Sequence, residues 1–138
     1  MPKTGPIMII EDDIDDQEFF KEAWDELQYP NPLKFFKRSE EVLQYLKQED
    51  VVPFLIISDV SLPKMNGFEL KKKLLEDHTI NHRTIPFIFF SDSASNEQIV
   101  KSYDLGSNGF FMKGRDIEEL KSILAKIFDY WQKSRTPE

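Results

Sequence analysis

The chain of 138 residues is long enough for one domain that buries about two thirds of the surface its unfolded form exposes. Its formal charge of -7, from 25 acidic and 18 basic residues, creates a field that repels nucleic acid and anionic lipid, so we expect neither direct nucleic-acid binding nor membrane attachment. The absence of cysteine excludes a disulfide framework and a thiolate metal site. The apolar residues near the start are too few for a signal peptide or a membrane span, so we expect a cytoplasmic protein.

The first half of the chain alternates between short apolar runs and segments of helical periodicity. Residues 6 to 11 predict a strand, and a helix over about 14 to 28 follows, where apolar side chains recur at helical spacing. Residues 33 to 36 predict a second strand, and Ser39 is expected to cap the next helix. The third strand follows Pro53.

The second half repeats this alternation. A loop with proline and glycine punctuation at 62–67 opens the third helix, and Pro86 begins the fourth strand. Ser95 with Gln98 three residues on has the form of a capping box, and the helix it starts is expected to stop near Gly106.

The last repeat is a short aromatic strand followed by a helix. The strand is predicted at 110–112, and Asp116 with Glu119 repeats the capping box. Apolar residues at helical spacing carry this helix to about Trp131.

Five such units predict an α/β protein with a flavodoxin-like (βα)5 three-layer sandwich. Right-handed crossovers through helices give a parallel five-stranded sheet, whose common strand order is 2-1-3-4-5. We expect a single domain over 1–138, with a core of about 6–132 between short polar tails. In this order the winding reverses between strands one and three, so a ligand crevice opens at their carboxyl ends.

Four apolar runs each end in a reactive polar side chain. These residues are Asp12, Asp59, Ser91 and Lys113. Because the carboxyl ends of parallel strands meet at one edge of a sheet, four separate segments deliver two carboxylates, a hydroxyl and an ammonium to one crevice. That set of groups predicts metal-assisted phosphoryl transfer to an aspartate.

Two acidic clusters are expected to meet in the crevice, one of them at Glu11 and Asp12 and the other at Asp59. Like charges in a crevice need a cation or a raised pKa to coexist, and Mg²⁺ is held by such carboxylates. Asp59 is the predicted nucleophile, since a carboxylate attacks phosphorus without a general base. The remaining acids of this segment are interpreted as a solvated helix start; they are Asp13, Asp15, Asp16 and Glu18.

Three other features have simpler interpretations or weaker signals. Ser91 can donate its hydroxyl to a phosphoryl oxygen, and Lys113 can place its charge beside the same group. The run of lysines at 71–73 is interpreted as a helix face in water.

With these positions fixed, the chain resembles a response-regulator receiver domain of two-component signalling over nearly its full length. The matching motifs are IIEDD at 9–13, ISDVSLPKMNG at 57–67, IPFIFFS at 85–91 and GFFMK at 109–113. The acids near the start, followed by FFKEA at 19–23, faintly resemble the stand-alone members that serve phytochrome-type photoreceptors.

The resemblance implies a role for each matching residue. Asp59 accepts a phosphoryl group from a histidine kinase or phosphotransfer protein, and Mg²⁺ is bound by Glu11, Asp12, Asp59 and the backbone carbonyl of Ser61. Ser91 is the switch hydroxyl, Lys113 binds phosphate, and Phe110 turns inward when the hydroxyl moves. The implied output is a downstream protein bound on the face of the fourth helix, fifth strand and fifth helix, with a homodimer as an option.

Two residues depart from the family pattern and leave alternatives open. Asp92 stands where a small residue is usual and is expected to slow phosphorylation, and Gly114 replaces the proline that usually follows the lysine. They favour, as the alternative, a degenerate receiver that binds partners without phosphorylation. An aspartate-nucleophile phosphohydrolase lacks its second acid at Ser61, and a flavin carrier would place its phosphate against the acids at 11–13. The resemblance implies a signalling domain that phosphorylates and dephosphorylates itself. Such a domain is not a conventional enzyme, so whether the protein counts as an enzyme stays open.

Overall fold

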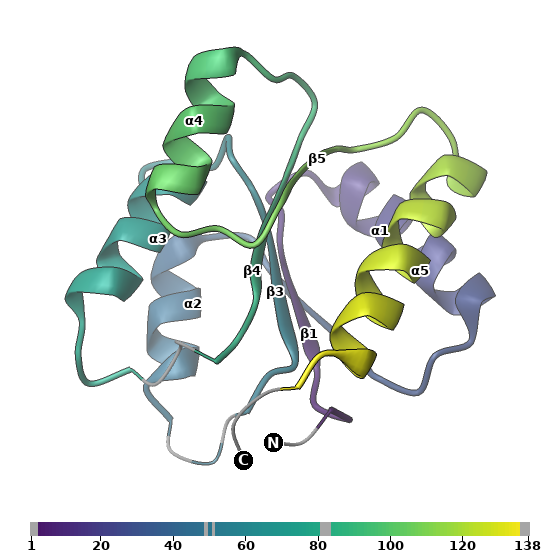
Figure 1. The fold of residues 1–138 in the computed structure, drawn as a ribbon, viewed down its shortest axis with the longest axis horizontal. Coiled ribbons are helices and arrows are strands. Elements are labelled where there is room, and N and C mark those ends of the chain that lie inside the picture. Colours follow the sequence, from purple (N-terminus) through teal and green to yellow (C-terminus); the bar gives the residue numbers. More distant parts are fainter. Residues whose placement is uncertain (1–2, 49, 51, 81–83, 136–138) are drawn as a thin grey trace.

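The computed structural model describes residues 3–48, 50, 52–80 and 84–135, in which strands and helices alternate along the chain (Figure 1). The elements are β1 Ile7–Ile10, α1 Ile14–Leu27, β2 Leu33–Phe36, α2 Ser39–Leu46, β3 Leu55–Asp59, α3 Gly67–Glu76, β4 Phe87–Ser91, α4 Asn96–Asp104, β5 Phe110–Met112 and α5 Ile117–Lys133. The predicted elements are therefore all found, and the last part of the predicted polar tail, 136–138, lies outside the described residues.

The five strands form one sheet of order β2-β1-β3-β4-β5, in which each neighbouring pair is parallel. Helices α1 and α5 cover one face of the sheet, and α2, α3 and α4 cover the other (Figure 1). The flavodoxin-like three-layer sandwich is thus confirmed. Within the described residues, no helix has the length and apolar character needed to cross a bilayer.

Both faces of the sheet are buried, which explains why the strands read as continuous apolar runs. In β1, Ile7 and Ile9 pack into a core cluster beneath α1 and α5, while Met8 and Ile10 pack into a second cluster beneath α2 and α3. Burying each such side chain contributes about 1.5–3 kcal/mol. The two tryptophans are both on this side: Trp24 belongs to the cluster beneath α1 and α5, and the partly buried Trp131 packs against it.

The helix caps agree only in part with the prediction. The Ser95–Gln98 capping box is confirmed. The expected cap at Ser39 is wrong, because its hydroxyl donates instead to the carbonyl of Met65 at 2.8 Å. Asp116 caps α5 through the N–H of Glu119, but the Glu119 side chain accepts from the N–H of Arg115 and does not complete a box.

The interpretation of the lysine run at 71–73 is wrong for its first member. The Lys71 side chain on α3 is buried, and its ammonium lies 5.3 Å from the centre of the Phe87 ring. Burial lowers the pKa of Lys71. The apolar stem of a lysine packs readily on hydrophobic surface, and the aromatic face attracts the cation, so charge alone does not mark a solvent-facing position.

Gly67 lets the start of α3 approach the end of β3. A Cβ atom at Gly67 would lie 2.2 Å from the carbonyl oxygen of Asp59, so we expect Gly67→Ala to destabilise the fold by about 3 kcal/mol, since backbone must move to admit the methyl group. Urea unfolding measures the change. Gly106→Ala is the control: its Cβ meets no atom within 4 Å, and only the left-handed backbone, at φ 79°, costs about 1 kcal/mol. Equal losses in the two variants would contradict the steric argument.

Candidate functional site

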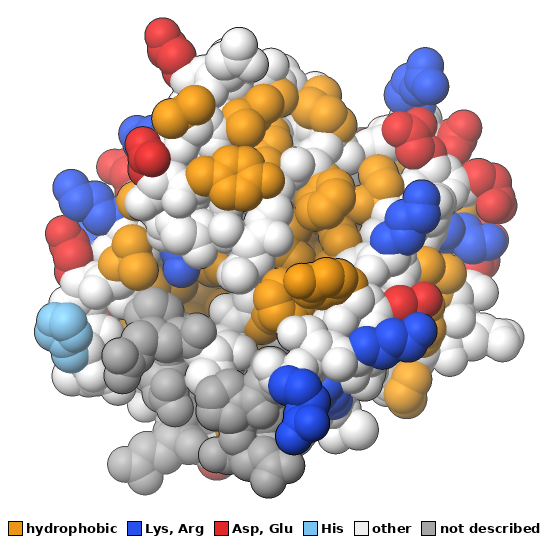
Figure 2. All heavy atoms as spheres, in the orientation of Figure 1, with side chains coloured by type: hydrophobic (Ala, Val, Ile, Leu, Met, Phe, Trp, Pro, Cys, Tyr) orange, Lys and Arg blue, Asp and Glu red, His pale blue; other side chains and the backbone are white. Residues whose placement is uncertain are grey.

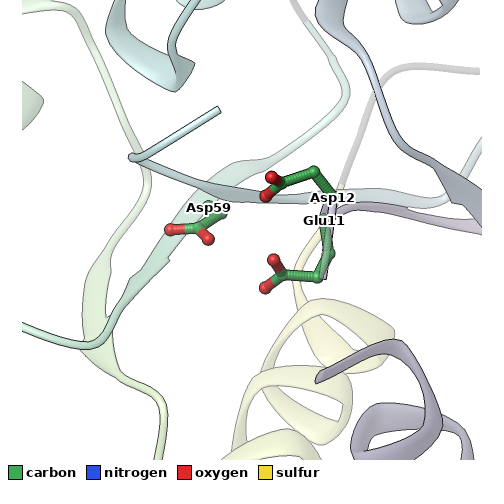
Figure 3. Close-up of side chains that lie close together, drawn as sticks. All are labelled: Glu11, Asp12 and Asp59. Atoms are coloured by element: carbon green, nitrogen blue, oxygen red, sulfur yellow. The ribbon is translucent and has the colours of Figure 1, made fainter. Parts of the chain in front are cut away.

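Three carboxylates converge at the carboxyl ends of two neighbouring strands. Glu11 and Asp12 directly follow β1, and Asp59 is the last residue of β3. The parallel register pairs Ile10 with Ser58, which brings the two strand ends level. One oxygen of each carboxylate lies within 4.8 Å of the others, and all three side chains point into a shared space (Figure 3).

This group of ligands fits a hard divalent cation. Carboxylate oxygens are the ligands that Mg²⁺ prefers, and one or two of them usually hold the ion together with water and phosphate oxygens. Glu11 is only 1% exposed and Asp59 is buried, whereas Asp12 is exposed to solvent. The cluster therefore offers a cation both buried charge and an open side for further ligands.

The ammonium of Lys113 lies among the carboxylates. It donates to Glu11 Oε1 at 2.6 Å, to Asp16 Oδ2 at 2.8 Å and to Asp59 Oδ2 at 3.0 Å. Asp92 Oδ2 lies farther away, at 3.7 Å. Lys113 directly follows β5 and is buried, so its charge is compensated in the crevice and not by bulk water.

Burial and nearby charges together shift the pKa values of Glu11 and Lys113. Burial raises the pKa of Glu11 to about 8, with the charge of Asp59 acting in the same direction and Lys113 opposing it. Burial lowers the pKa of Lys113, but its hydrogen bonds to Asp16, Glu11 and Asp59 outweigh that effect and hold the pKa above its ordinary value. Lys113 therefore stays protonated at neutral pH, while Glu11 binds a proton more readily than an ordinary carboxylate.

The remaining predicted site residues are Ser61, Ser91 and Phe110, and only Ser61 bonds directly to a carboxylate of the cluster. The backbone N–H of Ser61 donates to Asp59 Oδ1 at 3.2 Å. Ser91 ends β4, and its hydroxyl donates to the carbonyl of Ser93 at 2.6 Å. Phe110, at the start of β5, is half-buried and packs against the core cluster beneath α2 and α3. The structure thus brings acids and a lysine from separate segments together, while the Ser91 hydroxyl bonds within its own loop.

The two departures from the family pattern also lie near the crevice. Asp92 is 80% exposed, so water screens its charge even though its carboxylate faces Lys113. Gly114 adopts a left-handed backbone with φ 60°, and the peptide bonds of the described residues are all trans. This conformation suits glycine and carries Lys113 into the crevice without proline.

Asp16 is the crevice residue that the sequence analysis missed. The sequence pattern places it with the solvated acids at the start of α1, yet its carboxylate accepts from Lys113. A signal for it exists in retrospect: Asp13 is the N-cap, accepting from the N–H groups of Asp15 and Asp16. The cap places Asp16 in the first turn of α1, directly after the strand that supplies Glu11 and Asp12.

Comparison with known proteins agrees with this arrangement. The model of the response regulator receiver domain family matches residues 7–125. The response regulator Rcp1 of Synechocystis sp. is 22% identical over 135 residues, which cover 94% of this chain and 90% of Rcp1. The probable transcriptional regulator ycf29 of Pyropia yezoensis is 39% identical over 73 residues, but the match covers only 32% of its length.

Solved structures show the same fold. The phosphorylated cyanobacterial phytochrome response regulator RcpA is 27% identical with a TM-score of 0.84, covering 97% of this chain and 99% of RcpA. The Mn²⁺-bound form of Rcp1 is 22% identical with a TM-score of 0.80 over the same shares of the two chains. The family match, the sheet order and the acidic crevice together show that this chain belongs to the response-regulator receiver domains of two-component signalling.

Proposed function

We propose that this chain is a phosphoacceptor receiver in which Asp59 takes a phosphoryl group from the phosphohistidine of a histidine kinase or phosphotransfer protein. The observation that carries the proposal is the convergence of Glu11, Asp12 and Asp59, with the buried Lys113 donating to two of them. A strand end that gathers several carboxylates and an ammonium is unfavourable for the fold alone, and it suits the transfer of an anionic group.

The chemistry begins at a carboxylate that needs no base. An oxygen of Asp59 attacks phosphorus and forms an acyl phosphate, while the bond from phosphorus to the donor imidazole nitrogen breaks. The electron pair of that bond goes to the nitrogen, which takes a proton from water. Lys113 then has a phosphoryl oxygen within reach of its ammonium, and the hydroxyl of Ser91 leaves the carbonyl of Ser93 to donate to another.

The proposed cofactor is Mg²⁺, held by Glu11, Asp12, Asp59 and the backbone carbonyl of Ser61. When bound, the ion supplies positive charge that offsets the repulsion between the carboxylates and the incoming phosphoryl oxygens. Glu11 and Asp12 keep this charge next to Asp59 because both directly follow β1, the neighbour of β3. The Mn²⁺ reported for Rcp1 supports a divalent ion in a receiver of this fold.

The proposed output is protein binding on the face formed by α4, β5 and α5. Apolar side chains gather over α4 and toward β5 (Figure 2), and exposed members include Val100, Tyr103 and Met112. Movement of the Ser91 hydroxyl toward the phosphoryl group frees space that Phe110 enters, which changes this face. A downstream target protein or a second copy of the chain binds the altered surface.

The phosphorylated state named for RcpA supports transfer to this chain, and a direct test is available. Incubation with acetyl phosphate and Mg²⁺ should add one phosphoryl group, detected by intact mass. A chelator of divalent ions should prevent the addition, because the carboxylates then repel the donor. If wild-type protein gains no phosphoryl mass from acetyl phosphate or from a phosphorylated histidine donor, a receiver that binds partners without phosphorylation replaces this proposal.

A further inference from the structure

The hydrogen bonds of Lys113 use all of its donor capacity. An ammonium has three N–H groups and no acceptor. In this structure the three donors go to Glu11, Asp16 and Asp59, at distances between 2.6 and 3.0 Å. A phosphoryl oxygen can therefore bind Lys113 only if one of these carboxylates gives up its donor.

The three partners of Lys113 differ in their relation to the cation cluster. Glu11 and Asp59 belong to the group of carboxylates that converge for a metal ion, and Asp16 does not. Asp16 comes from the first turn of α1 and is 33% exposed at its side chain, so it approaches the lysine from outside the cluster. When Glu11 and Asp59 turn to other ligands, Asp16 is the carboxylate that still holds the lysine.

We propose that Asp16 is a positioning residue that anchors Lys113 independently of the cation cluster. This inference rests on the proposed function and extends it to a residue outside the receiver motifs. With Asp16 in place, Lys113 stays beside Asp59 while Glu11 and Asp59 engage the cation and the phosphoryl group. Its charge is then available where the phosphoryl oxygens arrive, and no lysine movement is needed.

Loss of Asp16 has a defined consequence. The ammonium then has only Glu11 and Asp59 as close partners. The lysine competes with the cation for Glu11 and shields the nucleophilic oxygen of Asp59. Mutation of a residue that orients a metal ligand without itself binding the metal typically lowers metal affinity or activity by about 10- to 100-fold.

The first test compares Asp16→Asn with Asp15→Asn. The second substitution removes the same charge from the adjacent residue. Asp15 is exposed, and within the described residues its carboxylate forms no ion pair. Calorimetric titration with Mg²⁺ should give about tenfold weaker binding for Asp16→Asn, and phosphoryl incorporation from acetyl phosphate should slow by a similar factor. Asp15→Asn should change either quantity by less than about twofold, because screening limits the effect of an exposed charge.

A double-mutant cycle shows whether Asp16 acts through the lysine. In a Lys113→Met background, Asp16→Asn should weaken Mg²⁺ binding no more than Asp15→Asn does, since no ammonium remains to be anchored. An undiminished tenfold effect in that background, or equal effects of Asp16→Asn and Asp15→Asn in the wild-type background, would overturn the inference. Wild-type protein that neither binds Mg²⁺ nor takes up phosphoryl groups would instead overturn the proposed function, so the two failures are distinguishable.

Discussion

Replacement of Asp59 with asparagine should abolish phosphoryl incorporation. The carboxamide has no ionised oxygen to attack phosphorus, so intact mass after treatment with acetyl phosphate and Mg²⁺ should equal that of untreated protein. The fold should survive, because asparagine still accepts from the N–H of Ser61 and removes one of several crowded negative charges. We expect the free energy of unfolding to change by less than about 1 kcal/mol.

Asp92→Asn is the matched control for Asp59→Asn. It removes a carboxylate from the same crevice, but one that is mostly exposed and lies on the loop after β4. This variant should still be phosphorylated at Asp59, at a rate no more than slightly above that of wild type, because the anion that is lost is largely screened by water. Phosphoryl mass on Asp59→Asn, mapped to another residue by peptide fragmentation, would remove Asp59 from the role of acceptor.

Replacement of Lys113 with methionine should lower the free energy of unfolding by about 3 kcal/mol at neutral pH in a metal-free buffer. Removing one partner from a buried group of charges leaves the other charges uncompensated. The resulting loss of stability exceeds the net stabilisation that the intact group contributes. Methionine keeps most of the apolar stem, so the loss reports on charge and not on a cavity. Urea unfolding in chelator and in Mg²⁺ measures the effect.

Mg²⁺ should narrow the difference in stability between Lys113→Met and wild type, because a bound cation compensates the same carboxylates. Lys121→Met is the control: this lysine pairs with Glu26 and Glu118 at the surface, where such pairs contribute about 1 kcal/mol or less. The decrease in the free energy of unfolding caused by Lys121→Met should not depend on Mg²⁺. If Lys113→Met lowers the free energy of unfolding as little as Lys121→Met does, the stability of the buried cluster does not depend on its lysine. Lys113→Met should still accept some phosphoryl groups, but partner affinity should respond less to phosphorylation.

The fold could be predicted because its strongest physical signals are local. Strands covered on both faces need nearly continuous apolar runs, and each of these runs ends where the sheet meets solvent. A polar residue at such an end, like Asp59 at the end of β3 or Lys113 after β5, is expected to lie at the edge of the sheet, because the apolar core does not accommodate it. Parallel topology then brings the ends together without any knowledge of distances.

The missed features depend on contacts between distant parts of the chain. Ser39 has the residue type of a cap, but the carbonyl of Met65 competes for its hydroxyl. Lys71 has the residue type of a solvent-facing position, but it is buried with its ammonium over the ring of Phe87. Asp16 looks like its acidic neighbours until Lys113, 97 residues later, approaches it. Propensity ranks residue types, and only the tertiary fold decides between the partners open to each.

The placement of the tryptophans determines what optical spectroscopy can detect in this protein. Trp24 lies in the core cluster beneath α1 and α5 and Trp131 packs against it, whereas Phe110 packs against the opposite cluster. Intrinsic indole emission therefore monitors denaturation of the α1 and α5 layer and is a poor probe of rearrangements around β5. A reporter introduced on the other side, such as Tyr103→Trp on exposed α4, would follow signalling in real time without an attached dye.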